Sequence, residues 1–286
     1  MNVFVVGLGL IGGSMALDIK AADSGIKIFG VDANEDHIDQ ALKIGFIDEK
    51  ATLEDLSKAD VVIVSIPVNA TVRLLPEILN KISDDTVVFD AGSTKVMVCE
   101  AVESHTKRRN FLAAHPIAGT EFSGPGAAIS NLFKNKTNII CEVEKTSFKF
   151  QEKALKLFTE IMGMRIRYMD PKSHDKHIAY MSHLSHISSF MLGKTVIEKE
   201  KNERDIFDMA GSGFESTVRL AKSSPEMWAP IFEQNKENVI ETLEEYIANL
   251  QNFKELMIKN DFVSIYNEME STNRIKEILK GITTNK

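Results

Sequence analysis

The chain begins with a glycine-rich loop directly after a short apolar run, and this feature limits its fold more than any other. Residues 3–14 read Val-Phe-Val-Val-Gly-Leu-Gly-Leu-Ile-Gly-Gly-Ser, which is the pattern G-x-G-x-x-G. In a βαβ unit the first glycine allows a tight turn, the second lets the backbone approach a pyrophosphate, and the third lets the helix pack closely on the strand. The N–H groups at the start of that helix then face the phosphates. The residues expected to bind a dinucleotide here are Gly7, Gly9, Leu10, Ile11 and Gly12.

A carboxylate follows the second apolar run. Asp32 lies 20 positions after Gly12, where a carboxylate can accept hydrogen bonds from both ribose hydroxyls and would repel a 2′-phosphate. No arginine follows closely to bind such a phosphate, since the next residues are Ala33, Asn34 and Glu35. The sequence therefore predicts NAD rather than NADP as the cofactor.

Short apolar runs alternate with amphipathic stretches over residues 1–170. Several runs are apolar throughout, as is typical of parallel strands that are buried on both faces. The expected strands are Asn2–Val6, Ile26–Val31, Asp60–Ile66, Thr86–Phe89, Phe111–Ala114, Thr137–Val143 and Met164–Met169. The helices expected between them include Ile11–Ala21, Asp36–Lys43 and Ser147–Ile161. This alternation predicts an α/β fold with right-handed βαβ units in a Rossmann-type doubly wound sheet.

The sequence changes character after residue 170, and no further strand is expected. The expected helices are His174–Glu200, Trp228–Leu256 and Asp261–Leu279, with a Gly- and Ser-rich connection at Asp208–Ser224. We therefore expect an NAD-binding Rossmann domain in residues 1–170, followed by an all-helical domain in residues 171–286.

The composition excludes several classes of protein. Lys and Arg number 34 and Asp and Glu number 41, so the formal charge of −7 argues against binding to nucleic acid, which needs clustered cations. Two cysteines cannot form a disulfide framework. No apolar run approaches the roughly 20 residues that cross a bilayer, and the apolar start lacks the basic region of a signal peptide. We expect a cytoplasmic protein with no membrane partner.

Polar side chains follow three of the expected strands at their carboxyl ends, where ligands bind in open α/β sheets. Ser65 and Pro67 follow one strand, Ser93 the next, and His115 the one after. His115 is the best candidate general base, because imidazole titrates near neutrality, and Ser93 could share the path of its proton. Singly, a loop-capping histidine and a helix N-cap serine are equally good interpretations. Together at adjacent strand ends, the two residues favour catalysis.

The helical half contains two further candidates. His174, His177, His183 and His186 lie within 13 residues, but they lack the spacing of known zinc sites and no cysteine is near, so no metal is expected. Arg219 can pair bidentately with a carboxylate. Considered alone, it is more simply interpreted as a surface arginine.

Taken in order, these motifs resemble those of prephenate dehydrogenases, the NAD-linked enzymes of tyrosine biosynthesis. The resemblance covers nearly the whole chain. It rests on Gly7–Ser14, Asp90–Lys95, His115–Glu121 with Ser123 and Gly124, Ser182–His186, and Thr217–Arg219 followed by Pro225–Trp228. It implies a Rossmann domain followed by a helical domain that builds a homodimer, with prephenate as the small-molecule substrate and tyrosine as a candidate inhibitor.

The resemblance also implies the reaction and the roles of residues. Prephenate would be decarboxylated oxidatively to 4-hydroxyphenylpyruvate, CO2 and NADH. His115 would accept a hydrogen bond from the ring hydroxyl with Ser93 beside it, and Arg219 would bind a carboxylate of the substrate. The other residues expected to contact the substrate are His186, Thr120, Glu121 and Ser182.

Four residues depart from the pattern of the family, and they bear on carboxylate binding and on the response to effectors. They are Phe122, Ser185, Ser212 and Glu215. Apolar side chains are also more numerous in the helical half than a few helices can bury, which favours a partner chain. They include Phe190, Met191, Leu192, Val196, Ile231, Phe232, Ile240, Leu243, Ile247 and Leu250.

Three alternatives remain open. Arogenate dehydrogenases perform the same chemistry on an amino acid instead of a keto acid, and the sequence does not identify the contact that discriminates the two. A dehydrogenase of the β-hydroxyacid or imine-reducing type would use a lysine such as Lys194 or Lys222, but would leave the His115 loop unexplained. An NAD-sensing regulator would need a DNA-binding element or a charged stripe, and neither is visible.

Overall fold

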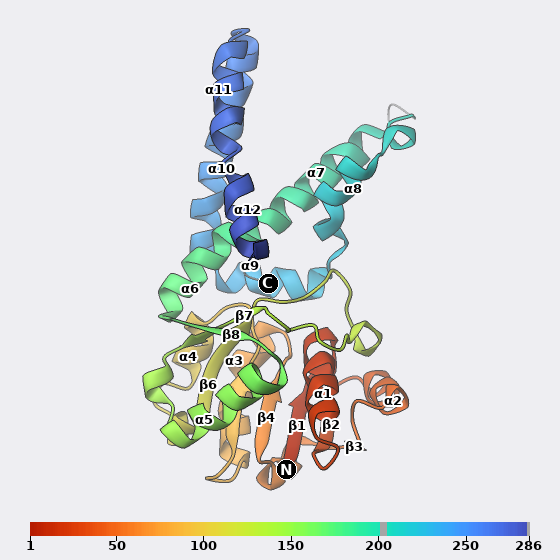
Figure 1. Cartoon of the computed structure of the whole chain (residues 1–286), viewed down its shortest axis with the longest axis vertical. Helices are drawn as coiled ribbons and strands as arrows, with labels where there is room; N and C mark the ends of the chain where they lie inside the picture. Colours follow the sequence, from red (N-terminus) through yellow and green to blue (C-terminus); the bar gives the residue numbers. More distant parts are fainter. Residues whose placement is uncertain (201–204, 285–286) are drawn as a thin grey trace. The chain divides into compact units, whose positions relative to one another are not determined.

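The computed structural model describes residues 1–200 and 205–284 of the chain. The chain divides into two compact units, Met1–Lys236 and Glu237–Lys286. The first unit contains the sheet and the helices as far as α9 (Pro225–Gln234), and every residue that the sequence assigns to a site lies in it. Figure 1 shows the elements in the order of the chain.

The first unit is built on one sheet. Within the described residues it has eight strands in the order β3-β2-β1-β4-β5-β6-β7-β8. They are β1 (Asn2–Val6), β2 (Lys27–Val31), β3 (Glu49–Lys50), β4 (Val61–Val64), β5 (Val87–Asp90), β6 (Phe111–Pro116), β7 (Thr137–Cys141) and β8 (Arg165–Met169). All the predicted strands are confirmed within a few residues. The short strand β3 was not predicted, because its two residues are charged and exposed.

One pair of strands corrects the prediction of a parallel sheet. β6 and β7 pair antiparallel, whereas all other neighbours pair in parallel. The connection between them, residues 117–136, contains a one-turn helix at Pro125–Ala127 but no crossover helix. A parallel return needs such a crossover, so this chain returns antiparallel. The α/β class is confirmed, and every element described after β8 is helical.

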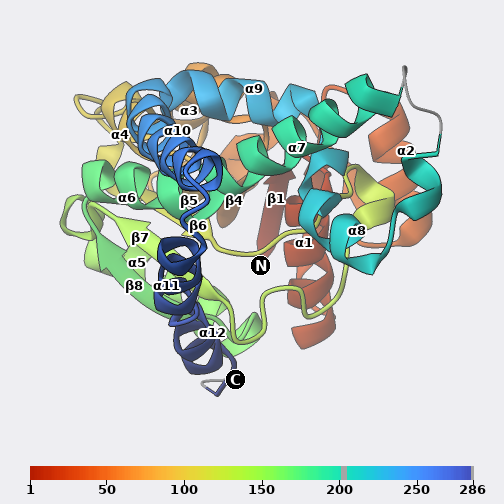
Figure 2. The same cartoon turned by 90° about the horizontal axis from the view of Figure 1, so that it is seen from above.

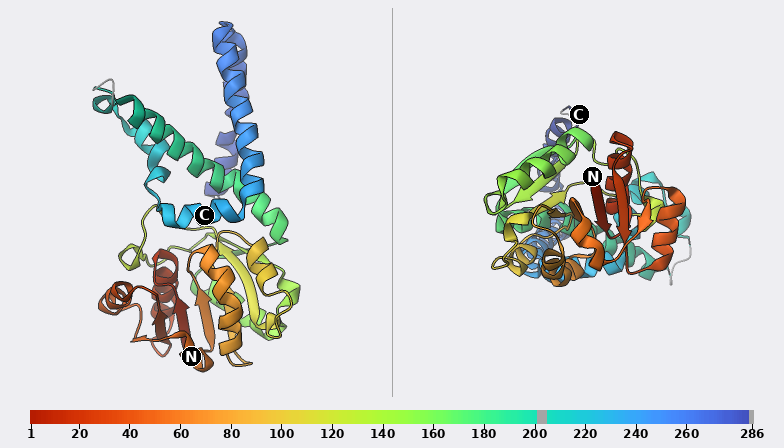
Figure 3. Two further views of the ribbon diagram at one scale, coloured as in Figure 1. Left: turned by 180° about the vertical axis from the view of Figure 1, so that it is seen from behind. Right: turned by 90° about the horizontal axis from the view of Figure 1, so that it is seen from below.

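Helices cover both faces of the sheet, as Figures 1 and 3 show. One face packs on α1 (Leu10–Ala22), α2 (Glu35–Ile44) and α5 (Phe148–Lys156), and the other packs on α3 (Val68–Lys81) and α4 (Val96–Ala101). Met15 and Phe158 lie in the first core cluster, and Leu75 and Val98 lie in the second. Strands between two such layers are buried on both sides, which is why β4 is apolar throughout.

The helices after β8 begin at Pro171. α6 (Pro171–Ile178) continues through a single π-helical turn at Ala179–His183 into α7 (Leu184–Glu200), which confirms the predicted helix there. The stretch Asp208–Ser224, which was predicted to hold a connection, also contains α8 (Ser212–Val218) and a turn of 3-10 helix at Arg219–Lys222. The domain boundary near residue 170 stays a prediction, since α6 to α9 belong to the same compact unit as the sheet.

α9 lies against α3, and Figure 2 shows the two helices side by side. Trp228 and Ile231 of α9 pack there on Val68 of α3. The predicted helix Trp228–Leu256 is interrupted at Asn235, which caps α9. The side-chain amide of Asn235 donates to the carbonyl oxygen of Asp175 at 2.7 Å, a tertiary contact that the helical pattern of the sequence cannot reveal.

The second unit consists of helices, with α10 (Lys236–Ile258), α11 (Phe262–Thr272) and α12 (Ile275–Thr284) in its described part. The side chain of Asn252 donates to Glu268 at 2.7 Å and joins α10 to α11. The predicted helix Asp261–Leu279 is therefore two helices. Among the residues that the structure describes, no helix combines the length and the apolar character that crossing a membrane requires.

Candidate active site

The glycine loop has the geometry that its pattern predicts. Gly7 has φ of +97°, and a Cβ atom there would lie 2.5 Å from the carbonyl oxygen of Ser65. A Cβ atom on Gly12 would lie 2.1 Å from the carbonyl oxygen of Gly7, so only glycine lets α1 approach the loop this closely. A Cβ atom on Gly9 would meet nothing within 4 Å. Two glycines are thus required by the fold, whereas Gly9 faces open space in which a ligand can approach the backbone.

Asp32 is fixed at the end of β2 by backbone groups. Its Oδ2 accepts a hydrogen bond from the N–H of Leu8 at 2.8 Å, and its Oδ1 accepts one from the N–H of Asn34 at 2.9 Å. Ser65, at the end of β4, donates through its Oγ to the carbonyl oxygen of Gly7 at 2.8 Å. The ends of three parallel strands are therefore tied together around the loop.

These residues fit a dinucleotide. Leu10 is buried and Ile11 half-buried in the first turn of α1, where the free backbone N–H groups of a helix start can face a phosphate. Pro67 precedes α3 and is exposed beyond the end of β4. The open space at Gly9 and the positioned carboxylate of Asp32 suit a pyrophosphate and a ribose.

A buried ion pair connects the ends of β5 and β6. The Asp90 carboxylate pairs with Lys95 Nζ, and both side chains are fully buried. The same carboxylate accepts the N–H groups of Gly92 and Ala114, each at 3.0 Å. Ser93 lies half-buried in the turn between Asp90 and Lys95, and its hydroxyl forms no hydrogen bond to any residue that the structure describes.

His115 lies at the end of β6 and is 8% exposed. Its Nδ1 lies 2.8 Å from Nε2 of His174 in α6, and Nδ1 of His174 lies 2.7 Å from Oδ1 of Asp175. Burial lowers the pKa of His115 well below its usual range, and the nearby His174, Lys95 and His183 lower it further. Burial also lowers the pKa of His174, although Asp175 opposes this shift. Both imidazoles are therefore neutral near pH 7.

Asp175 joins α6 to the β5–α4 turn. Its Oδ1 accepts the N–H of Lys95 at 2.8 Å, and its Oδ2 accepts the N–H of Val96 at 2.9 Å. The helices after β8 thus reach the carboxyl edge of the sheet at the same place as His115.

The predicted substrate residues form two groups. Arg219 Nη1 lies 2.9 Å from Glu121 Oε2, which joins the turn after α8 to the loop after β6. Hydrogen bonds from its own backbone N–H and from Arg219 lower the pKa of Glu121. Thr120 is next to this pair, and its Oγ1 accepts the N–H of Phe122 at 3.3 Å.

The second group surrounds His186. Its Nδ1 donates to the carbonyl oxygen of Ser182 at 2.9 Å, and its ring stacks on Trp228 with a centroid separation of 3.5 Å. Burial lowers the pKa of His186, and the charge of Arg219 adds to this shift. The ring of His183 packs edge-on against the same Trp228. The structure thus brings Arg219 together with Glu121, and His186 together with Ser182.

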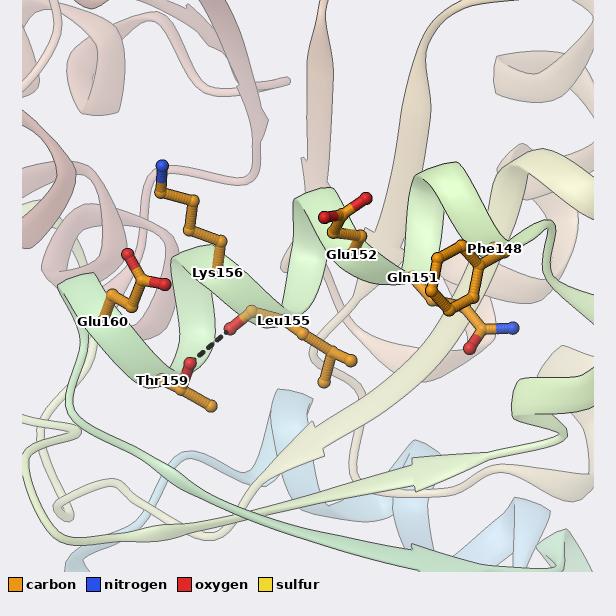
Figure 4. A pocket seen from close by; sticks show the side chains of 7 residues that line it. All are labelled: Phe148, Gln151, Glu152, Leu155, Lys156, Thr159 and Glu160. Atoms are coloured by element: carbon orange, nitrogen blue, oxygen red, sulfur yellow. Dashed lines mark hydrogen bonds between the residues drawn. The ribbon is translucent and has the colours of Figure 1, made fainter.

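A hollow of about 430 Å³ lies elsewhere, along the outer side of α5 and its one-turn continuation (Figure 4). It is lined by Phe148, Gln151, Glu152, Leu155, Lys156, Thr159 and Glu160. None of these side chains comes from a strand end, so the hollow is separate from the candidate site.

Sequence reasoning missed His174, Asp175 and the Asp90–Lys95 pair as contributors to the site. The signal for His174 was present, because it belongs to the histidine cluster and directly precedes a carboxylate. Its contact with His115 depends on the docking of α6, which no local pattern predicts. Lys194, the lysine that a β-hydroxyacid-type enzyme would use, is 62% exposed and pairs with Glu198 on the same helix at 3.8 Å.

Comparisons with known proteins point to one family. Residues 15–167 match the family described as "Prephenate dehydrogenase, nucleotide-binding domain", and residues 170–271 match "Prephenate dehydrogenase, dimerization domain". The prephenate dehydrogenase of Bacillus subtilis is 31% identical over 93% of this chain and 72% of its own length.

Two solved structures are similar along nearly their whole length. The prephenate dehydrogenase of A. aeolicus, in complex with hydroxyphenyl propionate and NAD+, has a TM-score of 0.86 and is 34% identical over 98% of each chain. The arogenate dehydrogenase of Synechocystis has a TM-score of 0.76 and is 26% identical over 98% of this chain and 100% of its own.

Proposed function

The chain belongs to the prephenate dehydrogenase family of oxidoreductases, and from this premise we propose that it oxidatively decarboxylates prephenate with NAD. The products are 4-hydroxyphenylpyruvate, CO2 and NADH, in tyrosine biosynthesis. One observation carries the proposal. A buried, neutral histidine stands at the end of β6, on the sheet edge that also holds the dinucleotide loop.

The cofactor is NAD, bound at the glycine loop. Gly9 leaves room for the pyrophosphate, and Asp32 accepts hydrogen bonds from the ribose hydroxyls while its charge repels a 2′-phosphate. When bound there, NAD would supply the hydride acceptor for C4 of the substrate ring. The protein binds and orients the two reactants so that C4 faces it.

His115 acts on the ring hydroxyl. Its Nδ1 is engaged by His174, so Nε2 is the nitrogen that accepts the hydrogen bond of the hydroxyl at C4. As the hydride leaves C4, positive character develops at this carbon, and the interaction with a neutral base stabilises it. Loss of the ring carboxylate as CO2 completes an aromatic ring, which supplies the driving force. Ser93, in the turn after the neighbouring strand, offers a second hydroxyl on the same side.

Arg219 binds a carboxylate of the substrate. The chain carries a formal charge of −7, so a dianionic substrate needs a local cation. The Arg219 side chain is half exposed and pairs with Glu121 at 2.9 Å. A substrate carboxylate replaces this partner or shares the guanidinium with it, since a guanidinium has five N–H donors. His186, Ser182 and Thr120 complete the substrate side.

Arogenate is the second candidate substrate, because one similar solved structure is an arogenate dehydrogenase. The experiment that decides between the two substrates measures initial rates with prephenate or arogenate, each with NAD or NADP. The rates are read from the absorbance of the reduced cofactor. We expect the highest kcat/KM for prephenate with NAD. A higher kcat/KM for arogenate would assign the chain to the other substrate.

We propose that the chain forms a homodimer in the cytoplasm. The match to a dimerisation domain over residues 170–271 supports this, as do the exposed apolar side chains of the helices, such as Met191, Ile247 and Leu250. Light scattering at micromolar concentration tests it, and a clean monomer would refute it.

Tyrosine shares the aromatic ring and the carboxylate of the product, so we place any inhibition by it at the substrate side. There, tyrosine raises KM for prephenate without lowering kcat.

A further inference from the structure

Two side chains outside the predicted site, His174 and Asp175, form a hydrogen-bonded chain that ends at the proposed base. Asp175 Oδ1 lies 2.7 Å from His174 Nδ1, and His174 Nε2 lies 2.8 Å from His115 Nδ1. The side chain of His174 is fully buried and that of Asp175 is 3% exposed. Neither residue is assigned to binding the cofactor or the substrate.

The positions of the protons follow from the acceptor at one end of this chain. Asp175 already accepts the backbone N–H groups of Lys95 and Val96, and a carboxylate can only accept hydrogen bonds. The hydrogen bond to Asp175 therefore requires the proton of His174 to be on Nδ1. A neutral imidazole carries one N–H, so Nε2 of His174 can only accept a hydrogen bond. The donor must then be Nδ1 of His115, which therefore carries the proton.

Asp175, at one end of this hydrogen-bonded chain, is held from two sides. Asn235 donates to the carbonyl oxygen of Asp175 at 2.7 Å, and the two N–H groups of the β5–α4 turn fix its carboxylate. The charged and titratable groups around the two imidazoles are Asp90, Lys95, Asp175 and His183. Lys95 is paired with Asp90, and its positive charge disfavours a second cation on either imidazole. The arrangement thus keeps both rings neutral. It also fixes the direction of the hydrogen bonds, in which His115 donates to His174 and His174 donates to Asp175.

We propose that His174 and Asp175 are positioning residues that hold His115 in the tautomer with its proton on Nδ1 and a lone pair on Nε2. Only this tautomer can accept a hydrogen bond from a substrate hydroxyl at Nε2. The identity of that hydroxyl rests on the proposed function, whereas the tautomer itself does not. An orienting carboxylate that acts through histidine is a known device in hydrolases, and here a second imidazole extends it.

The direct test is nitrogen-15 NMR of the intact protein with labelled histidines at neutral pH, without substrate. The chain has seven histidines, and the signals of His115 are identified by their loss in His115→Asn. We expect a protonated Nδ1 and an unprotonated Nε2 for His115. A protonated Nε2 in the wild-type protein would overturn the proposal, whatever substrate the enzyme uses.

Substitutions then separate positioning from a purely structural role. Asp175→Asn presents an amide N–H donor to His174, which can reverse the direction of the hydrogen bonds from residue 175 to His115. We therefore expect the proton of His115 to move to Nε2 and kcat to fall about 10²-fold or more. KM for NAD should stay within about twofold, because the glycine loop is untouched. A normal kcat in a folded Asp175→Asn variant contradicts the proposal.

A matched pair at His174 gives the second comparison. His174→Gln retains an oxygen that can accept from His115 Nδ1, whereas His174→Phe offers no acceptor. We expect kcat of His174→Gln to exceed that of His174→Phe about tenfold or more, the difference in rate for about 1.4 kcal/mol of lost hydrogen bonding. His177→Gln, on the exposed side of the same helix, is the control and should behave as wild type. Equal kcat for the two His174 variants would contradict the proposal.

Failure of this proposal is distinguishable from failure of the proposed function. A protein that lacks turnover with prephenate but has the expected tautomer refutes only the function. A protein that turns over prephenate with Nε2 of His115 protonated refutes only the positioning chain.

Discussion

The two ends of the candidate site are held in different ways. At the cofactor end, the glycine loop and Asp32 are fixed by backbone groups, and two of the glycines leave no space for a Cβ atom. At the substrate end, His115 depends on a chain of buried side chains, and Arg219 forms an ion pair that is half exposed. The backbone therefore fixes the shape of the cofactor end. At the substrate end, the chemistry depends on individual side chains, and replacing one of them can change it.

This difference separates the consequences of mutation. We expect a change in the glycine loop to disturb the fold or cofactor binding, and a change at His115 or Arg219 to alter the rate or the substrate affinity with the fold intact.

Replacing the proposed base should have the largest effect. We expect His115→Asn to lower kcat by roughly 10²–10⁴, the usual contribution of a general base, with KM little changed. Stopped-flow or steady-state rates with prephenate and NAD measure it, and circular dichroism verifies the fold. A kcat close to wild type would remove His115 from the mechanism.

Arg219 should matter for affinity rather than rate. Losing a hydrogen-bonded charge partner costs about 1.5–3 kcal/mol, so Arg219→Ala should raise KM for prephenate roughly 10- to 150-fold with a smaller change in kcat. Arg167→Ala, on the exposed strand β8, is the control for loss of a positive charge. If both variants have the KM of the wild type, Arg219 is not at the carboxylate site.

Two glycine variants sharpen the description of the cofactor end. Gly12→Ala places a Cβ atom 2.1 Å from a backbone oxygen, and overpacking of this kind lowers the free energy of unfolding by about 1–3 kcal/mol or more. Gly9→Ala meets no protein atom within 4 Å, so it should leave the Tm unchanged and raise only KM for NAD. Urea unfolding and rates at varied NAD concentration test the pair. Equal destabilisation by both substitutions would contradict the assigned roles.

Asp32 should control the choice of cofactor. Asp32→Asn removes the charge that repels a 2′-phosphate but keeps an oxygen acceptor for the N–H of Leu8. The ratio of kcat/KM for NAD to that for NADP should fall about tenfold, corresponding to about 1.4 kcal/mol. An unchanged ratio would place cofactor discrimination elsewhere.

The last prediction concerns stability in acid rather than activity. Burial lowers the pKa of His115, His174, His183 and His186, for His183 to about 4. The unfolded chain binds protons near pH 6.5 and the folded chain does not, so stability is present above that pH and is lost as the pH falls below it. Each such histidine contributes a slope of up to about 1.4 kcal/mol per pH unit. Thermal unfolding from pH 7 to pH 5 should show a falling Tm, and a constant Tm would contradict these shifts.

Much of the first half of the chain could be predicted, because local signals determine it. The apolar runs marked the strands, and the G-x-G-x-x-G pattern with Asp32 marked the cofactor end. The antiparallel pairing of β7 was missed because it depends on the absence of a crossover helix. Strand ends also located His115 and Ser93.

The helical part was harder to predict, for reasons that are also physical. The helix break at Asn235 goes with a tertiary contact that periodicity does not reveal, whereas α8 lies in a stretch whose glycines and serines predicted a connection. The contact between His174 and His115 joins residues 59 positions apart through the docking of α6. A sequence pattern can propose that a histidine is functional, but it cannot say which second histidine touches it.

The most direct test of the account is the stoichiometry of the reaction with prephenate and NAD. Product analysis of a single incubation measures 4-hydroxyphenylpyruvate, CO2 and NADH together. The account predicts equal amounts of the three, all lost in parallel when His115 is replaced by Asn. NADH formed without release of CO2, or no turnover of prephenate by a protein that binds NAD, would contradict it.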